Sequence, residues 1–173
     1  MLSEPTLLAE HHQLDAFTSG EPSLDEWLKR RARGNQVNGS SRTFVVCDEA
    51  GAVVAYYSLA AGSIGRTDAP KVLQRNRPNP IPVMILGRLA IHTGYQQQGF
   101  GTALLRDAIV RTLHVAGTVG MAALLVHAVS EDARRFYLSR GFLESPLQPM
   151  TLVLPLASAQ ATMDESSPGT NPG

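Results

Sequence analysis

The stretch from Val83 to Ala116 constrains the fold of this chain more than any other part. Val83–Ile91 is a nearly continuous apolar run, typical of a strand buried on both faces. From Gly101 onward apolar residues recur at helical spacing, at Leu104, Leu105, Ala108, Ile109, Leu113 and Ala116. A buried strand that passes through a glycine turn into an amphipathic helix predicts an α/β sheet with a parallel centre.

The first half of the chain contains further predicted elements. A short strand is expected at Thr6–Ala9, and Ser23-Leu-Asp-Glu26 matches a capping box that would begin a helix ending at Arg33, before Gly34. Thr43–Asp48 and Val53–Ala60 are rich in β-forming residues and predict a hairpin. The proline-rich stretch Thr67–Pro82 predicts a loop.

The second half continues the alternation of strands and helices. Met121–Val129 predicts another buried strand, and Ser130 is a suitable N-cap for a short helix that would stop at Arg140-Gly141. A last strand is expected at Met150–Leu154. Residues 1–156 are therefore expected to form one domain, and residues 157–173, rich in Ala, Ser, Thr, Pro and Gly, a disordered tail.

Composition excludes several classes of protein. The single cysteine, Cys47, excludes an internal disulfide framework and a zinc site built from several cysteines, and no metal site is predicted. Cys47 lies in an apolar run, where a small core residue is the favoured interpretation. No signal peptide and no run near the ~20 apolar residues of a membrane span are present. We therefore expect a cytoplasmic protein that does not enter membranes.

The glycine turn Gln96-Gln-Gln-Gly99-Phe-Gly101 has the chemistry of an anion site. A helix N-terminus offers unpaired amides and a positive dipole end, and glycines let a phosphate approach the backbone. The turn lacks the lysine of a P-loop and the third glycine of a dinucleotide fingerprint. Taken alone, the pattern is equally compatible with a plain loop-to-helix turn.

The order of motifs resembles the GNAT superfamily of acetyltransferases. The turn matches its Gln/Arg-x-x-Gly-x-Gly/Ala motif, and Ala133-Arg-Arg-Phe-Tyr-Leu-Ser-Arg-Gly-Phe142 matches the segment that carries its tyrosine. The resemblance implies a mixed twisted sheet, flanked by helices, with a central parallel pair that splays near Gly87–Ile91. It also implies acetyl-CoA as the acetyl donor.

The resemblance assigns the cofactor contacts to two segments. The backbone of Leu89, Ala90 and Ile91 is expected to pair with the pantetheine arm. The amides of the turn are expected to hold the pyrophosphate, and the full set is Gln96, Gln97, Gln98, Gly99, Phe100, Gly101 and Thr102.

Tyr137 is the expected catalytic residue, because the motif places it there and a phenol can protonate a departing thiolate. The alternative is a core aromatic beside Phe136. No convincing general base is found: Glu131 and Asp132 suit the helix start, His127 suits a core position, and His92 is a weak candidate. A site without a base favours an α-amine, which is far more often neutral than a lysine amine at pH 7.

A narrower resemblance points to the GNAT toxins of bacterial type II toxin–antitoxin systems, which acetylate the α-amine of the amino acid on charged tRNA and so block translation. It rests on Leu24–Leu28, Asn76–Ala90, Leu125–Ser130 and Phe142–Met150, within a match from about Pro5 to Pro155. It implies a ribbon-helix-helix antitoxin, operator DNA bound only through the antitoxin complex, and a homodimer.

Local charge agrees with a nucleic-acid substrate, although the formal net charge of the whole chain is zero. The segment from Trp27 to Arg88 contains ten basic residues and three acidic ones. Phosphate binding requires such a local excess of positive charge. The residues expected to bind tRNA are Lys29, Arg30, Arg33, Arg75, Arg77 and Arg88. A solvated basic face is the alternative. Two other functions remain open: a GNAT enzyme acting on a small amine or a protein N-terminus, and an inactive acyl-CoA-binding module.

Overall fold

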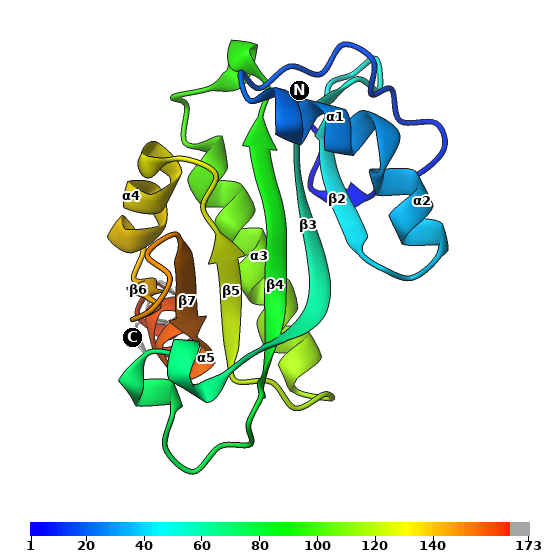
Figure 1. The fold of residues 1–173 in the computed structure, drawn as a ribbon. Helices are drawn as coiled ribbons and strands as arrows, with labels where there is room; N and C mark the ends of the chain where they lie inside the picture. Colours follow the sequence, from blue (N-terminus) through cyan, green and yellow to red (C-terminus); the bar gives the residue numbers. More distant parts are fainter. Residues whose placement is uncertain (167–173) are drawn as a thin grey trace, which may run out of the picture. The chain divides into compact units, whose positions relative to one another are not determined.

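The structure is a computed structural model and describes residues 1–166. The chain divides into two compact units, which are described separately. Met1–Ala61 and Ile85–Arg111 form the first, and Gly62–Met84 together with the chain from Thr112 onward forms the second. The strand order is β1-β2-β3-β4-β5-β7-β6, and β3, β4 and the helix α3 each contribute residues to both units (Figure 1).

The elements follow one another in a mixed α/β order. In the first half they are β1 (Thr6–Leu7), α1 (Pro22–Arg30), α2 (Ala32–Val37), β2 (Arg42–Cys47), β3 (Val53–Ile64), the 3₁₀ turns η1 (Arg66–Asp68) and η2 (Lys71–Leu73), and β4 (Ile81–Ile91). In the second half they are η3 (Thr93–Tyr95), α3 (Phe100–Ala116), β5 (Ala123–His127), α4 (Glu131–Ser139), β6 (Leu143–Glu144), β7 (Thr151–Pro155) and α5 (Leu156–Ser166).

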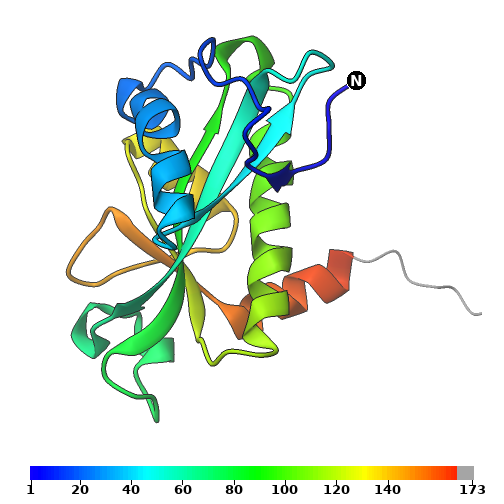
Figure 2. The ribbon, with the colours of Figure 1, turned by 90° about the vertical axis from the view of Figure 1, so that its right-hand side faces the viewer.

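In the first unit, β3 presents alternate side chains to two layers of helix. Strands β1, β2 and β3 pair antiparallel, and helices α1 and α2 lie on the face of these strands opposite α3 (Figure 2). The fully buried ring of Tyr56 stacks on Trp27 of α1, whereas the equally buried Tyr57 donates a hydrogen bond to Asp107 of α3. Because neighbouring strand residues point to opposite faces, these two tyrosines anchor the two layers.

The contact between Tyr57 and α3 is part of a larger polar cluster. Asp107 also accepts from Nε of Arg111 at 2.9 Å, and the Arg111 guanidinium lies 4.1 Å from the centre of the Phe44 ring and donates to the Pro5 carbonyl. Burial and the neighbouring Asp107 carboxylate raise the pKa of Tyr57, so its proton stays in place as the donor. The cluster connects α3, β2, β3 and the N-terminal segment.

We expect Tyr57→Phe to lower the free energy of unfolding by about 1–3 kcal/mol, because it leaves a partly buried carboxylate without this donor. Urea denaturation measures the change. Tyr137→Phe is the matched control, since the hydroxyl of Tyr137 makes no hydrogen bond within the described residues. Equal stability losses in the two variants would contradict a role for the Tyr57–Asp107 bond.

In the second unit, β7 lies between β5 and β6 and pairs antiparallel with both. All five residues of β7 are buried. The predicted Ser130 cap is confirmed, since its hydroxyl accepts from the amide of Ala133 at 3.1 Å, and Gly141 ends the helical segment with a φ of +94°.

Two predictions for the first helix are wrong. The N-cap is Glu21 rather than Ser23, and no side chain caps the helix, because Pro22 begins the helix and places Ser23 inside the first turn. The helix also ends early, at Arg30, and Gly34 lies within the next helix, α2, instead of stopping the first. Packing of Ala32 into the core holds this second helix, so the glycine there does not break it.

The C-terminal segment also differs from the expectation of a disordered tail. Leu156–Ser166 forms α5, with Leu156 and Ala159 buried and the Leu156 amide bonded to the Ala122 carbonyl. These contacts provide the apolar burial that composition alone did not indicate. Residues 167–173 of the predicted tail lie outside the described residues. Within residues 1–166, no helix has the length and apolar character needed to cross a membrane.

Candidate functional site

The glycine turn has the open backbone that its sequence predicts. Gln97 and Gly99 both adopt positive φ angles, +61° and +85°, and α3 begins at Phe100. Apart from Gly99 itself and its two chain neighbours, no atom lies within 4 Å of the position that a β-carbon on Gly99 would occupy. The turn therefore combines a helix N-terminus with free space beside an exposed backbone, which is the geometry that a pyrophosphate requires.

The side chain of Gln96 holds the start of this turn in place. Its Nε2 donates to two carbonyls, that of Ser19 at 2.7 Å and that of Ile91 at 2.9 Å. Both amide hydrogens are used in these bonds, so any contact of Gln96 with a pyrophosphate would have to come from its backbone. Ser19 lies 77 residues from Gln96, and no sequence signal pointed to their contact.

The strand that precedes the turn comes close to its neighbour. A β-carbon on Gly87 would lie 2.8 Å from Oγ of Ser58, so only a glycine allows the two strands to come this close here. At the end of the strand the His92 amide donates to the Val54 carbonyl. Of the residues expected to pair with pantetheine, Ala90 is buried, and Leu89 and Ile91 are half-buried.

Arg88 lies against an aromatic ring. Its guanidinium carbon is 4.2 Å from the centre of the Trp27 ring, which itself stacks on Tyr56. No hydrogen bond or salt bridge of this guanidinium occurs within the described residues. The structure therefore places Arg88, one of the residues expected to bind tRNA, on an aromatic ring by a cation–π contact.

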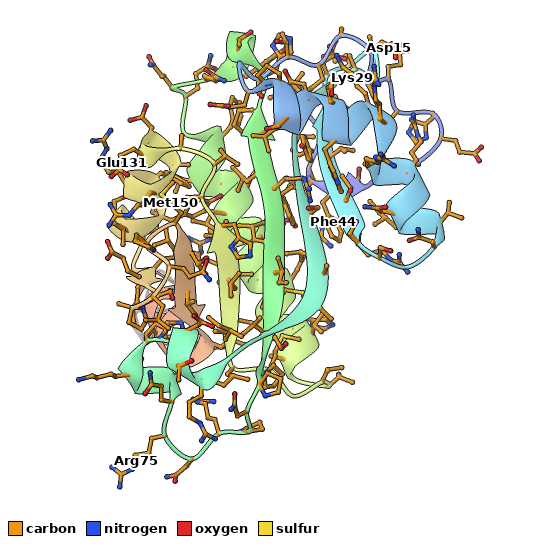
Figure 3. The ribbon with its side chains drawn as sticks, in the orientation of Figure 1. Asp15, Lys29, Phe44, Arg75, Glu131 and Met150 are labelled. Carbon is orange, nitrogen blue, oxygen red and sulfur yellow. The ribbon has the colours of Figure 1, made fainter. Side chains whose placement is uncertain are left out.

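The predicted tRNA-binding residues of the first unit fall into two groups. Lys29 and Arg30 are exposed in the last turn of α1 and make no ion pair within residues 1–166; Lys29 is labelled in Figure 3. Arg33 is different, because its Nη2 donates to the His12 carbonyl at 2.6 Å and contacts those of Ala9 and Glu10 at 3.4 Å. Of these three predicted residues, Lys29 and Arg30 are therefore the ones whose charges remain free within the described residues; we call them the free cations of α1.

Two further predicted tRNA-binding residues belong to the second unit. Arg75 is exposed in the loop before β4 and points away from the ribbon (Figure 3). Arg77 is half-buried, and its carbonyl accepts a hydrogen bond from Arg66 at 2.6 Å. The region predicted as a loop thus carries the 3₁₀ turns η1 and η2, and the bond between Arg66 and Arg77 spans most of it.

Tyr137 lies on α4 with only 5% of its surface exposed. Its ring packs against Phe136 and Phe142, with centres 5.1 and 5.2 Å apart. Burial raises the pKa of Tyr137 above its ordinary value, so the phenol is protonated at neutral pH. The hydroxyl has no hydrogen-bond partner within the described residues, so its proton is not already shared with another acceptor of the chain.

The candidates for a general base have other contacts. Glu131 and Asp132 pair with Arg134 at 2.9 Å and Arg135 at 2.6 Å, as expected of residues at a helix start. The predicted core position of His127 is wrong: the side chain is exposed at the end of β5, where Nδ1 lies 2.9 Å from Oγ1 of Thr151. His92 is half-buried, and its Nδ1 accepts from the Gly94 amide.

Cys47 occupies the core of the first unit, as its apolar surroundings predicted. The thiol is unpaired and the residue is 5% exposed. Burial and the neighbouring Asp48 carboxylate raise the pKa of Cys47. A buried thiol with a raised pKa is a poor nucleophile, so Cys47 is a structural residue.

The sheet order, the glycine turn and the buried tyrosine define an acetyltransferase of the GNAT class. The family model described as "Acetyltransferase (GNAT) domain" matches residues 40–144, and the chain belongs to this family. The chain is 44% identical to the tRNA-acetylating toxin of Mycobacterium tuberculosis, over 94% of this chain and 98% of that protein.

Two solved structures extend the comparison. AtaT complexed with acetyl-methionyl-tRNAfMet is 28% identical, covers 94% of this chain and 99% of that one, and superposes with a TM-score of 0.87. A tyrosine-to-phenylalanine mutant of the AtaT toxin, bound to the C-terminus of the antitoxin AtaR and to acetyl-CoA, is 26% identical with a TM-score of 0.80. It covers 95% of this chain and 99% of that one.

Proposed function

We propose that this protein is an acetyl-CoA-dependent toxin that acetylates the α-amine of the amino acid on charged tRNA and so blocks translation. The observation that carries the proposal is the near full-length likeness to a tRNA-acetylating toxin, at 44% identity. The open glycine turn and the protonated Tyr137 support it, because the turn offers a site for the cofactor pyrophosphate and Tyr137 offers a proton for the departing thiolate. An inactive acyl-CoA-binding module would keep the turn but would not need Tyr137.

In the proposed reaction, the neutral α-amine attacks the thioester carbonyl and forms the new C–N bond. The tetrahedral adduct then collapses with cleavage of the C–S bond, and the Tyr137 hydroxyl gives its proton to the departing thiolate. The proton released by the amine passes to water. A CoA thiol has a pKa near ~8.5 and an ordinary tyrosine one near ~10. Burial raises the pKa of Tyr137 further, so the proton transfer to the thiolate is uphill.

Each candidate base already makes a hydrogen bond or an ion pair, and this favours the α-amine as acceptor. An α-amine has a pKa of roughly 7.7–8.0, so a substantial fraction is neutral at pH 7, whereas a lysine amine near ~10.4 is almost entirely protonated. In the proposed function, the acetyl-CoA pyrophosphate is held by the backbone of Gln96–Thr102 and its pantetheine arm by Leu89–Ile91.

The free cations of α1 are proposed to contact tRNA phosphates. We expect the double variant Lys29→Glu, Arg30→Glu to weaken tRNA binding by at least about tenfold and to flatten its salt dependence, because phosphate contacts release counterions. Filter binding at several salt concentrations measures both quantities. Lys71→Glu, Arg106→Glu is the control, with the same change in charge at exposed positions outside the proposed set. Equal losses in the two variants would show a global charge effect and remove α1 from the site.

The proposal includes the protein partners. We propose a ribbon-helix-helix antitoxin that neutralises the enzyme, operator DNA bound only through that complex, a homodimer, and action in the cytoplasm. The support is the antitoxin-bound state of AtaT, a relative of similar length. Co-expression with such a protein encoded next to the toxin gene is expected to restore growth, and failure to restore growth would reject this partner.

Acetyl transfer from radiolabelled acetyl-CoA to a total pool of charged tRNA tests the proposed function directly. Deacylated tRNA is the control, because it lacks the α-amine and keeps every phosphate. Label that appears only on charged tRNA is the expected result. No label on charged tRNA, with acetyl-CoA binding intact, would direct the search to small amines and protein N-termini.

A further inference from the structure

The loop that connects Phe17 to α1 is bonded directly to the segment that leads into the glycine turn. The Thr18 carbonyl accepts from the Thr93 amide at 2.8 Å, and the Ser19 carbonyl accepts from Nε2 of Gln96 at 2.7 Å. Two consecutive carbonyls of the loop before α1 thus accept hydrogen bonds from Thr93 and Gln96, which lie three residues apart in the segment that leads into the glycine turn. The shape of the glycine turn depends on where Thr18 and Ser19 are held.

Asp25, in the first turn of α1, holds this loop. Its carboxylate accepts from the Ser19 amide at 3.0 Å and from the Ser19 hydroxyl at 2.6 Å. The Ser19 hydroxyl in turn accepts from the Glu21 amide at 3.2 Å. Hydrogen bonds to an ionised acceptor are stronger than neutral ones, so the half-buried carboxylate is the strongest polar anchor of the loop.

The glycine turn needs such an anchor because its backbone is strained. Gln97, which directly follows Gln96, has a φ of +61°, a left-handed conformation that a residue with a β-carbon rarely adopts. Strained backbone persists only where the surrounding structure determines it. Gln96 is fixed by its bonds to Ser19 and Ile91, and Ser19 is fixed by Asp25.

We propose that Asp25 and Ser19 are positioning residues for acetyl-CoA, acting through Gln96 on the shape of the pyrophosphate turn. The inference rests on the proposed function, because it assumes that this turn binds acetyl-CoA. It makes cofactor affinity depend on a carboxylate of α1, the helix that also carries Lys29 and Arg30. Neither residue touches the cofactor in this role.

Calorimetric titration of the full chain with acetyl-CoA, without acceptor, tests the proposal. We expect Asp25→Asn to weaken binding about tenfold, because the neutral amide is a weaker acceptor than the carboxylate, and its NH2 group replaces an oxygen that accepts from the Ser19 amide. Glu26→Gln is the matched control: it removes the same charge from the next residue of α1, where the exposed carboxylate makes no hydrogen bond within the described residues. In steady-state assays the KM for acetyl-CoA should rise in Asp25→Asn while kcat is retained, a split that general destabilisation does not produce.

A second pair keeps the test decisive if Asp25→Asn fails to fold. Ser19→Ala removes the hydroxyl bond and is expected to weaken acetyl-CoA binding about threefold or more, whereas Ser19→Thr keeps the hydroxyl and retains affinity. Wild-type affinity in folded Asp25→Asn or in Ser19→Ala would overturn the positioning role alone. A wild-type protein that does not bind acetyl-CoA would instead overturn the proposed function itself.

Discussion

Tyr137→Phe is expected to lower the rate of acetyl transfer to charged tRNA by about 10²–10⁴-fold, the usual contribution of a positioned general acid. The reason is that the departing thiolate loses its proton donor, while the remaining ring still fills the same buried space between Phe136 and Phe142. Growth arrest on expression should disappear with the activity. Single-turnover transfer of labelled acetyl groups measures the effect.

The fold and the cofactor affinity should survive this substitution. The Tyr137 hydroxyl makes no hydrogen bond within the described residues, so its removal leaves no buried partner unpaired. Acetyl-CoA binding should therefore stay within about twofold of the wild-type value. Tyr95→Phe removes a second phenol that likewise makes no hydrogen bond within residues 1–166, and it should remain active. Full activity of Tyr137→Phe would show that another group, or water, protonates the thiolate.

Gly99→Val is expected to weaken acetyl-CoA binding by about 30-fold or more. A side chain at a φ of +85° costs about 1–2 kcal/mol, and the valine would occupy the open space beside the backbone where we place the pyrophosphate. Calorimetric titration of the purified variant measures the loss.

The variant Gly39→Val distinguishes the cost of a side chain at a positive φ from the loss of space for the pyrophosphate. Gly39 has nearly the same φ, +81°, and equally open space, but it lies in the turn after α2, outside the glycine turn. Both variants should lose similar stability to thermal unfolding, and only Gly99→Val should lose cofactor affinity. Equal and small effects on affinity in the two variants would place the pyrophosphate elsewhere.

Much of the fold and the position of the site could be predicted from local patterns. The apolar run that forms β4, the helical spacing of α3 and the cap at Ser130 are properties of residues close in sequence. The first helix shows the limit of such patterns, because Ser23 fits a capping box equally well whether the helix begins at Pro22 or later. Helix α5 shows a second limit of local patterns, because the burial of Leu156 and Ala159 depends on distant parts of the chain.

The sequence by itself determined the strand–turn–helix unit and the glycines of the turn, because short-range periodicity and backbone freedom specify them. The tyrosine of α4 follows from the resemblance of its motif to the GNAT superfamily. The tertiary structure alone decided which polar groups distant in the sequence meet. It bonded Gln96 to Ser19 across 77 residues, tied Arg33 to carbonyls and placed Arg88 on Trp27. The physical reason is that a hydrogen bond or cation–π contact requires a few ångströms of separation and a set direction, which only the packed chain establishes.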